Sequence, residues 1–208
     1  MLGIKDNTKL YFISDTHFYH DKCIDYCSRP FEYNIDYDIS RIDIMKCKLI
    51  ENWNKIVPED GIVIIGGDFA FTSNIEKITT LLNSLNGTKY LVLGNHCYQN
   101  KFDRKSVREL FEGTSDILDV KVFDEEIDDG FQWINVCHYP IEAWSKKAKG
   151  SWMLHGHIHS GSLSTAKDRN IRFIPNRYDI GVDNNNFTPV SYSDIKTIIT
   201  RQNLKGEL

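Results

Sequence analysis

The sequence has little that would place this protein at a membrane or on a nucleic acid duplex. Its N-terminus lacks the basic and then apolar pattern of a signal peptide, and no apolar run approaches the length that spans a membrane. The formal net charge is −4, so no basic footprint for duplex nucleic acid is visible, although a local basic groove is compatible with this total. We therefore expect a cytoplasmic protein with neither a membrane nor a nucleic acid duplex as its partner.

Cysteine is scarce and odd in number, with five residues in 208. Without a secretory signal, these residues are expected to be reduced thiols. Cys23 and Cys27 are able to bind metal, but no second cysteine pair completes a site, and a spacing of four is typical of one face of a helix. The sequence also lacks internal repeats, low-complexity tracts and linkers, so residues 1–208 are expected to form a single domain.

What the sequence does contain is an alternation of apolar strand-like runs and helical patterns. Strands are expected at residues 9–14, 62–65, 89–93, 119–123, 131–136, 151–155, 171–174 and 178–182. Helices are expected at residues 40–57, 74–85, 101–111 and 193–201. Residues 18–40 are expected to form a long aromatic loop of a functional kind. This alternation predicts an α/β fold whose site lies at the carboxyl ends of the strands.

Histidines are concentrated at the ends of the expected strands. His155, His157 and His159 alternate in a single stretch, and Gly156 allows the chain to turn within it. The strand ends together offer Asp15, His17, Asp68, Asn95, His96, His138, His157 and His159. Buried core histidines have no reason to collect at strand ends, and this mixture of carboxylate, imidazole and carboxamide groups suits Mn, Fe or Zn better than Ca. The alternative for the histidine stretch alone is a surface loop that binds metal incidentally.

Five short motifs follow one another along the chain in an order that resembles the calcineurin-like metallophosphoesterases. They are Asp15-x-His17, Gly67-Asp68, Gly94-Asn95-His96, a lone His138 and Gly156-His157-x-His159. Residues 18–30 and 138–140 are also similar to those of a small bacterial and phage subgroup of this family. The resemblance implies a four-layer α/β/β/α sandwich, in which two mixed β-sheets are flanked by helices.

The same resemblance implies a centre of two divalent metal ions, with manganese favoured and iron, zinc, nickel or magnesium as alternatives. Asp15, His17 and His159 would hold one ion. The other ion would be held by Asn95, His138 and His157, and Asp68 would bridge the two. A hydroxide between the ions would attack the phosphorus in line.

His96 would contact a phosphate oxygen or assist the leaving group, so His96, Asp68 and Asn95 are the expected catalytic residues. His155 precedes the matching motif and is expected to be a hydrogen-bonded strand residue. Cys97 stands where the family often has an acid that orients the histidine, and Phe71 stands where a second acid often occurs. Neither departure removes a metal ligand.

Substrate contacts are expected from the loop that follows the first strand. His20 and Arg29 are candidates beside Asn95 and His96, because arginine binds phosphate through two hydrogen bonds. The alternatives are a solvated His20 and a surface salt bridge for Arg29. We predict an enzyme, a metal-dependent phosphoesterase, whose phosphate-ester substrates are phosphodiesters or small nucleotides. A phosphoprotein phosphatase of the same fold and a non-catalytic metal-binding scaffold are the competing hypotheses.

Overall fold

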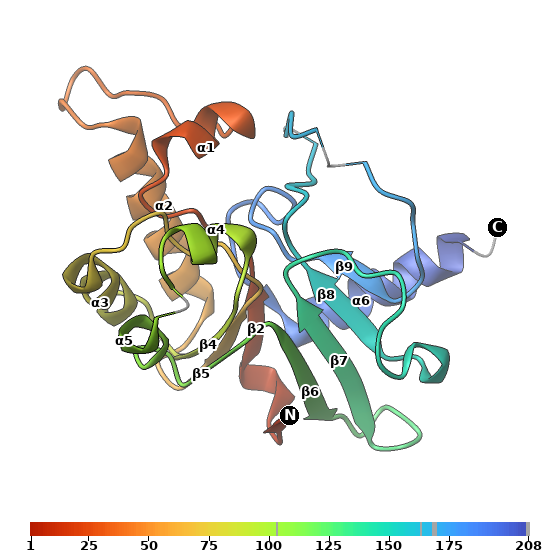
Figure 1. The fold of residues 1–208 in the computed structure, drawn as a ribbon. Coiled ribbons are helices and arrows are strands. Elements are labelled where there is room, and N and C mark those ends of the chain that lie inside the picture. The colour runs from red at the N-terminus through yellow and green to blue at the C-terminus, as the bar shows by residue number, and fades with distance from the viewer. Residues whose placement is uncertain (103, 163, 168–169, 207–208) are drawn as a thin grey trace.

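Two five-stranded sheets pack face to face in the computed structural model, which describes residues 1–102, 104–162, 164–167 and 170–206 (Figure 1). The first sheet contains, in spatial order, β1 (Leu2–Ile4), β6 (Ile117–Phe123), β7 (Phe131–Cys137), β8 (Trp152–His155) and β9 (Arg177–Asp179). Only β6 and β7 are antiparallel neighbours in this order, and the other pairs are parallel. The sheet is therefore mixed.

The second sheet contains β10 (Val190–Ser191), β2 (Leu10–Ile13), β3 (Ile62–Ile65), β4 (Thr88–Val92) and β5 (Gly113–Ser115) in spatial order. Strands β2 to β5 are parallel to one another, and β10 is antiparallel to β2. Ile13 pairs with Ile65, which pairs with Leu91. The carboxyl ends of three strands consequently reach the same edge of the sandwich.

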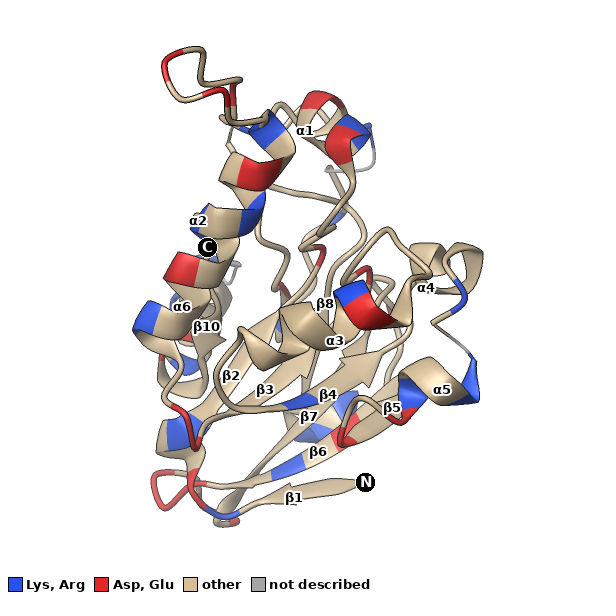
Figure 2. Ribbon diagram, turned by 90° about the vertical axis from the view of Figure 1, so that its left-hand side faces the viewer, with Lys and Arg blue, Asp and Glu red and all other residues tan. Residues whose placement is uncertain are grey.

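Helices flank the sheets. They are α1 (Asp21–Tyr26), α2 (Arg41–Ile56), α3 (Ile75–Asn83), α4 (Asn95–Gln99), α5 (Lys105–Arg108) and α6 (Tyr192–Gly206), with 3₁₀ turns η1 (Asn7–Lys9) and η2 (Lys147–Lys149). Ser40 caps α2 by accepting a hydrogen bond from the amide of Asp43. Helix α6 packs against β2, β9 and β10. Acidic and basic residues are interspersed along α2 (Figure 2), which is typical of a helix whose outer side faces water.

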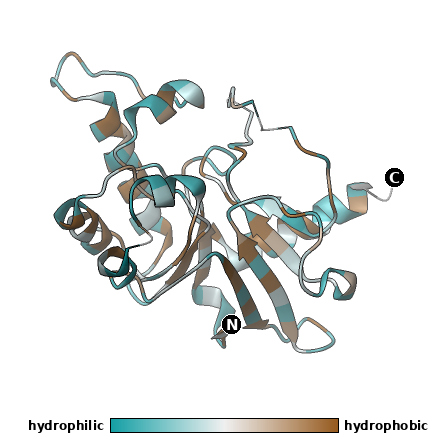
Figure 3. Ribbon diagram, in the orientation of Figure 1, coloured by the Kyte–Doolittle hydropathy of each residue, from teal (hydrophilic) through white to brown (hydrophobic). Residues whose placement is uncertain are grey.

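The central strands are buried on both faces, which explains their continuous apolar runs. Phe12 and Ile64 point between the sheets, where they pack with Val120, Ile134 and Leu154 of the other sheet. Ile13 and Ile65, one residue further along, face the opposite way and pack with Trp53 of α2 and Ile78 of α3. Figure 3 accordingly shows long brown, hydrophobic stretches on strands of both sheets.

The expected α/β fold, with two mixed sheets and flanking helices, is confirmed. Two expected elements are wrong. The helix predicted at 101–111 is reduced to the four residues of α5, with residue 103 outside the described residues. Residues 171–174 form no strand, and Ile171 and Phe173 are exposed, so their alternation does not face a core. Helices α1 and α4 and strands β1, β5 and β10 were not predicted. Among the described residues, each helix is too short or too polar to cross a membrane.

Candidate metal centre

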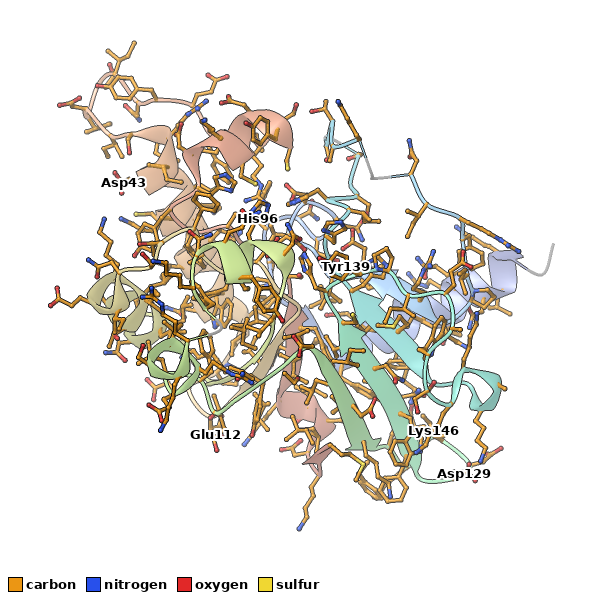
Figure 4. The ribbon with its side chains drawn as sticks, viewed as in Figure 1. Asp43, His96, Glu112, Asp129, Tyr139 and Lys146 are labelled. Carbon is orange, nitrogen blue, oxygen red and sulfur yellow. The ribbon has the colours of Figure 1, made fainter. Side chains whose placement is uncertain are left out.

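The loops that follow β2, β3, β4, β7 and β8 meet at one edge of the sandwich. They bring together the expected ligands Asp15, His17, Asp68, Asn95, His138, His157 and His159. His96 and Tyr139, which border this group, lie at the same end of the two sheets in Figure 4, whereas Glu112 and Asp129 lie towards the other end. The site is therefore built from both sheets.

One group of ligands surrounds the carboxylate of Asp15. Its Oδ1 lies 4.0 Å from Nε2 of His17 and 3.8 Å from Nε2 of His159. Donor atoms that share one ion at about 2.0–2.2 Å are separated by distances of this order. The spacing fits a single cation between these three side chains.

A second group surrounds the amide oxygen of Asn95. This oxygen lies 3.0 Å from Nε2 of His138 and 3.1 Å from Nδ1 of His157. The carboxylate of Asp68 lies between the two groups, because its Oδ2 is 3.3 Å from Nε2 of His138 and 3.8 Å from Nε2 of His17. Asp68 is therefore placed to bridge two cations.

The chemistry of the donors fits metal ions. His17 is only 2% exposed, and its Nε2 is the buried side-chain polar atom that lacks a hydrogen-bond partner among the described residues. Leaving such an atom unsatisfied costs about 1–3 kcal/mol. Burial also lowers the pKa of His17, so its imidazole is neutral. A neutral, buried nitrogen without a partner is what a cation requires of a histidine ligand.

Outer contacts fix which nitrogen of each imidazole is available. Nδ1 of His138 lies 3.0 Å from the carbonyl oxygen of Gly66 and donates to it, which leaves Nε2 facing Asp68. In the same way Nδ1 of His159 lies 2.7 Å from Oδ2 of Asp183 while Nε2 faces Asp15. A hydrogen bond to the second ring nitrogen is the usual means of orienting a metal-ligating histidine.

Asp183 is itself held by Arg29. The guanidinium donates from Nε and Nη2 to the two carboxylate oxygens, each at 2.8 Å. Its remaining donors reach the backbone carbonyls of Asp15, at 2.7 Å, and Thr16, at 3.2 Å. Burial opposes ionisation of Asp183, but the Arg29 charge and the His159 hydrogen bond outweigh it and lower the pKa to about 2. An anion is thus fixed behind His159.

His20 supports His17 from the pocket wall. Nδ1 of His20 lies 3.1 Å from Nδ1 of His17, and the His20 ring is stacked on Phe71 with centroids 4.1 Å apart. Burial, followed by the nearby His96, lowers the pKa of His20 to about 4, so the ring is neutral at pH 7. A cation on Nε2 of His17 would leave the proton of this ring on Nδ1, which would then donate to His20. Phe71 is the platform for this contact.

His96 is oriented by Gln99, three residues further along α4. Nδ1 of His96 lies 2.8 Å from Oε1 of Gln99. Cys97 does not replace the missing acid, because its thiol is buried and burial raises its pKa to about 12. The side-chain amide of Gln99 therefore orients His96, in place of the carboxylate that was expected at the position of Cys97.

The motif glycines allow the backbone to approach the carboxylates. A Cβ on Gly156 would lie 2.0 Å from Oδ2 of Asp15, and one on Gly94 would lie 2.3 Å from Oδ1 of Asp68. The backbone N–H groups of His157 and His96, which follow closely, donate to these carboxylates at 3.0 and 2.9 Å. A larger residue at either glycine would displace a metal ligand.

Left-handed backbone recurs among the expected ligands. Left-handed φ angles occur at Asp15 (56°), His17 (49°), Asp68 (46°), His157 (72°) and His159 (46°). Such a conformation costs a non-glycine residue on the order of 1–3 kcal/mol and persists where the surroundings enforce it, commonly at functional sites. Five of the seven expected ligands have this conformation.

A pocket of about 450 Å³ opens over the ligands. It is lined by His17, His20, Cys23, Tyr26, Cys27, Asp68, Asn95, His96, His157, His159, Thr165, Ala166 and Lys167. Helix α1 and residues 165–167 therefore form walls that the metal-ligand motifs do not supply.

A sequence profile of the calcineurin-like phosphoesterases matches residues 8–184, a range that contains every ligand described above. The chain belongs to the calcineurin-like phosphoesterase family. Membership supports a metal-dependent phosphoesterase, a hydrolase acting on phosphate esters.

The chain is also similar to individual proteins of known sequence or structure. It is 32% identical over 196 residues to the uncharacterized protein MJ1445 of Methanocaldococcus jannaschii, covering 93% of this chain and 92% of the relative. The crystal structure of AQ665 from Aquifex aeolicus, a protein of unknown function, covers 91% of this chain and 98% of its own, with a TM-score of 0.60 and 22% identity. The latter likeness shows the same fold. A Pseudomonas putida nuclease, MPE, matches at 14% identity with a TM-score of 0.41, over 74% of this chain and 62% of its own.

Within this calcineurin-like phosphoesterase the seven expected ligands lie together, and their binding of metal stays a prediction. The expectation that Arg29 contacts substrate is corrected, because its guanidinium is buried against Asp183 and does not line the pocket. The alternative of a surface salt bridge is right about the salt bridge, which Asp183 provides, but wrong about its location, since Arg29 is 4% exposed. His155 ends β8, is buried and hydrogen-bonds to Gly156, as expected.

Three residues of the site were missed from the sequence. Asp183 directly follows the strand predicted at 178–182, so its position at a strand end was a signal that went unused. Gln99 gave no signal, because its contact with His96 depends on the unpredicted helix α4. Cys23 was set aside as a helical coincidence with Cys27, and the two thiols do share one turn of helix, 3.8 Å apart.

Proposed function

We propose that this protein is a dinuclear metal-dependent phosphoesterase that hydrolyses phosphodiesters or small nucleotides. The observation that supports this most directly is the position of the Asp68 carboxylate between two complete groups of donors. Two-metal phosphoesterase sites hold their ions about 3.5–4 Å apart with a shared ligand. A non-catalytic scaffold is disfavoured because each expected ligand position is filled.

Two bound ions would neutralise phosphoryl charge and activate water for in-line attack. Nδ1 of His96 donates to Gln99, so Nε2 in the imidazolium form would carry the proton that goes to a phosphate or leaving-group oxygen. Asn95 turns its amide oxygen towards His138 and His157, so its NH₂ group remains as a donor to substrate. Asp68 accepts the backbone N–H of His96 and so couples the metal ligands to the helix that presents His96.

The pocket suits a small ester. Its volume of about 450 Å³ lies within the range of roughly 300–1,000 Å³ that accommodates small molecules. His20 lines it, and because Nδ1 of this ring accepts from His17, Nε2 carries the hydrogen and can donate to a phosphate oxygen. The exposed rings of Phe71, stacked on His20, and of Tyr139, 4.7 Å from the His157 ring, are surfaces for stacking a base.

We also propose that residues 1–208 act as one domain in the cytoplasm and that manganese is among the resident ions. Mixed carboxylate, carboxamide and imidazole donors support a borderline divalent metal. The shared core between the two sheets, in which Leu10 and Phe12 pack with Val120 and Val136, supports a single unit.

The test is an assay of chelated protein resupplied with Mn, Mg, Zn or Fe, using bis-p-nitrophenyl phosphate as the diester and p-nitrophenyl phosphate as the monoester. Diester cleavage that depends on added metal and disappears in Asp68→Asn is expected. Monoester cleavage alone would show that the diester preference is wrong. Failure to bind metal would overturn the proposal.

A further inference from the structure

A thiol lies beside the first group of metal ligands. Cys23 is in the first half of α1, which begins directly after His20, and its side chain is 2% exposed and lines the pocket. Its sulfur and one nitrogen each of His17 and His159 all lie within 4.8 Å of one another. The three side chains thus converge from α1, the loop after β2 and the loop after β8.

The second observation is independent of the cysteine. Nε2 of His17 is buried and has no hydrogen-bond partner within the part of the chain that the structure describes. This nitrogen therefore awaits an electron-pair acceptor, and it belongs to one of the two imidazoles that the Cys23 sulfur approaches. His17 and His159 are two of the three side chains assigned to the first ion, so Cys23 borders that position and not the one made by Asn95, His138 and His157.

Cys27 lies differently. Its sulfur groups with His159 and Asp183, and Asp183 contacts Nδ1 of His159, the nitrogen that faces away from Asp15. It is also 3.8 Å from the Cys23 sulfur, within hydrogen-bonding distance for sulfur. Cys27 is thus on the Asp183 side of His159, where its S–H can donate to a Cys23 thiolate.

We propose that Cys23 is an additional, thiolate ligand of the ion held by Asp15, His17 and His159. The inference rests on the proposed dinuclear centre. Coordination replaces the S–H proton, which is released to solvent, by the metal–sulfur bond.

A thiolate makes the two metal positions chemically unequal. Soft sulfur ligands favour zinc or ferrous iron, whereas carboxylate and carbonyl oxygens suit manganese and magnesium. The first position, with Cys23, is therefore selective for zinc or iron. The second position, with Asn95, His138, His157 and the bridging Asp68, has only nitrogen and oxygen donors and is the one that takes manganese.

Cobalt spectroscopy tests the assignment without relying on turnover. The chelated full-length protein is titrated anaerobically with Co²⁺, and bound cobalt is measured by equilibrium dialysis. A sulfur-to-cobalt charge-transfer absorption in the near ultraviolet is expected in the wild type and in Cys27→Ser. The absorption is expected to vanish in Cys23→Ser and Cys23→Ala, whose folding is checked by circular dichroism.

Metal competition gives a second readout. Dialysis against mixed zinc and manganese should show that Cys23→Ala lowers the zinc preference of the first position by about tenfold or more. Cobalt bound to the wild type without the charge-transfer absorption would overturn the role of Cys23 while leaving the dinuclear centre intact. Persistence of the absorption in Cys23→Ser would also overturn it. Absence of any bound cobalt would overturn both this inference and the proposed function.

Discussion

Oδ2 of Asp183 lies 2.7 Å from Nδ1 of His159. The contact fixes the proton of this imidazole on Nδ1 and directs Nε2 towards Asp15, while Arg29 holds the carboxylate from its other side. His159 thereby connects the Asp183 carboxylate to the proposed cation site. Outer partners of this kind orient the metal-ligating imidazole and raise its basicity as a ligand.

Asp183→Ala is therefore expected to weaken binding at the first metal position by about 10–100-fold. The substitution also leaves the buried guanidinium of Arg29 without its anion, so thermal stability should fall as well. Metal affinity is measured by calorimetric titration of the chelated protein, with the exposed Asp129→Ala as the matched control. Equal affinity in Asp183→Ala and Asp129→Ala would contradict the role of this carboxylate.

The pair formed by His96 and Gln99 separates catalysis from metal binding. His96→Ala is expected to lower kcat by about 10²–10⁴-fold, as the loss of a proton-transfer group does, with both metals retained. Gln99→Ala should cost about tenfold, because the ring remains but loses its orienting acceptor. Gln99→Glu keeps an acceptor at this position and should restore much of the rate.

Steady-state kinetics and metal analysis of the same preparations check these expectations. Unchanged turnover in His96→Ala would show that the assigned role is wrong. Loss of metal in that variant would mean that the imidazole of His96 supports the metal ligands and does not act on substrate alone.

Strands with continuous apolar runs were the most predictable part of the fold. Ile62–Ile65 was predicted to the residue, because four β-prone apolar residues bounded by Gly61 and Gly66 allow few alternatives. Short edge strands such as β10 were missed, since two residues have no periodicity. Residues 171–174 were wrongly predicted as a strand because they do show a periodic pattern. They alternate as a strand does, but β9, which begins at Arg177, occupies the edge of β8 instead.

The convergence of the seven expected ligands could be anticipated because these residues follow the strand ends along the chain. Their supporting partners could not, because these contacts depend on tertiary packing. Arg29 illustrates the limit: the sequence shows a cation near the site, but only the fold reveals that Asp183, 154 residues away, already pairs with it. Local sequence does not reveal which residue pairs with a buried charge.

Asp124 is expected to contribute acid-sensitive stability far from the metal ligands. It is 3% exposed and accepts hydrogen bonds from Tyr192 at 2.6 Å and Lys196 at 2.7 Å, which connects the end of β6 to α6. Burial alone would raise the pKa of Asp124, but these hydrogen bonds outweigh it and lower the pKa. A lowered pKa in the folded state means that stability is fully present above the unfolded value of about 3.9 and is lost as the pH falls through the lower, folded value.

Asp124→Ala should therefore lower the free energy of unfolding by about 1–3 kcal/mol at pH 7, the cost of leaving buried partners unsatisfied. The difference from the wild type should shrink as the pH is lowered through the acid range. Urea unfolding of the chelated protein at a series of pH values measures it, with Asp129→Ala as the exposed control. A difference that is independent of pH would show that the charge of Asp124 is not responsible.

Gly156→Ala tests whether the centre requires the backbone at residue 156 to lie close to the Asp15 carboxylate, in addition to the correct ligand residues. The new Cβ would lie 2.0 Å from Oδ2 of Asp15 and 2.1 Å from Oγ of Ser14, so the carboxylate or the loop that presents His157 must move. Overpacking of this kind typically costs about 1–3 kcal/mol, and we expect weaker metal binding together with lower stability in the metal-free state. Gly3→Ala is the matched control, because a Cβ there meets nothing within 4 Å. If Gly156→Ala bound metal as tightly as Gly3→Ala, the carboxylate of Asp15 would have to tolerate a displaced position. The requirement for glycine would then lie in chain flexibility and not in the contact.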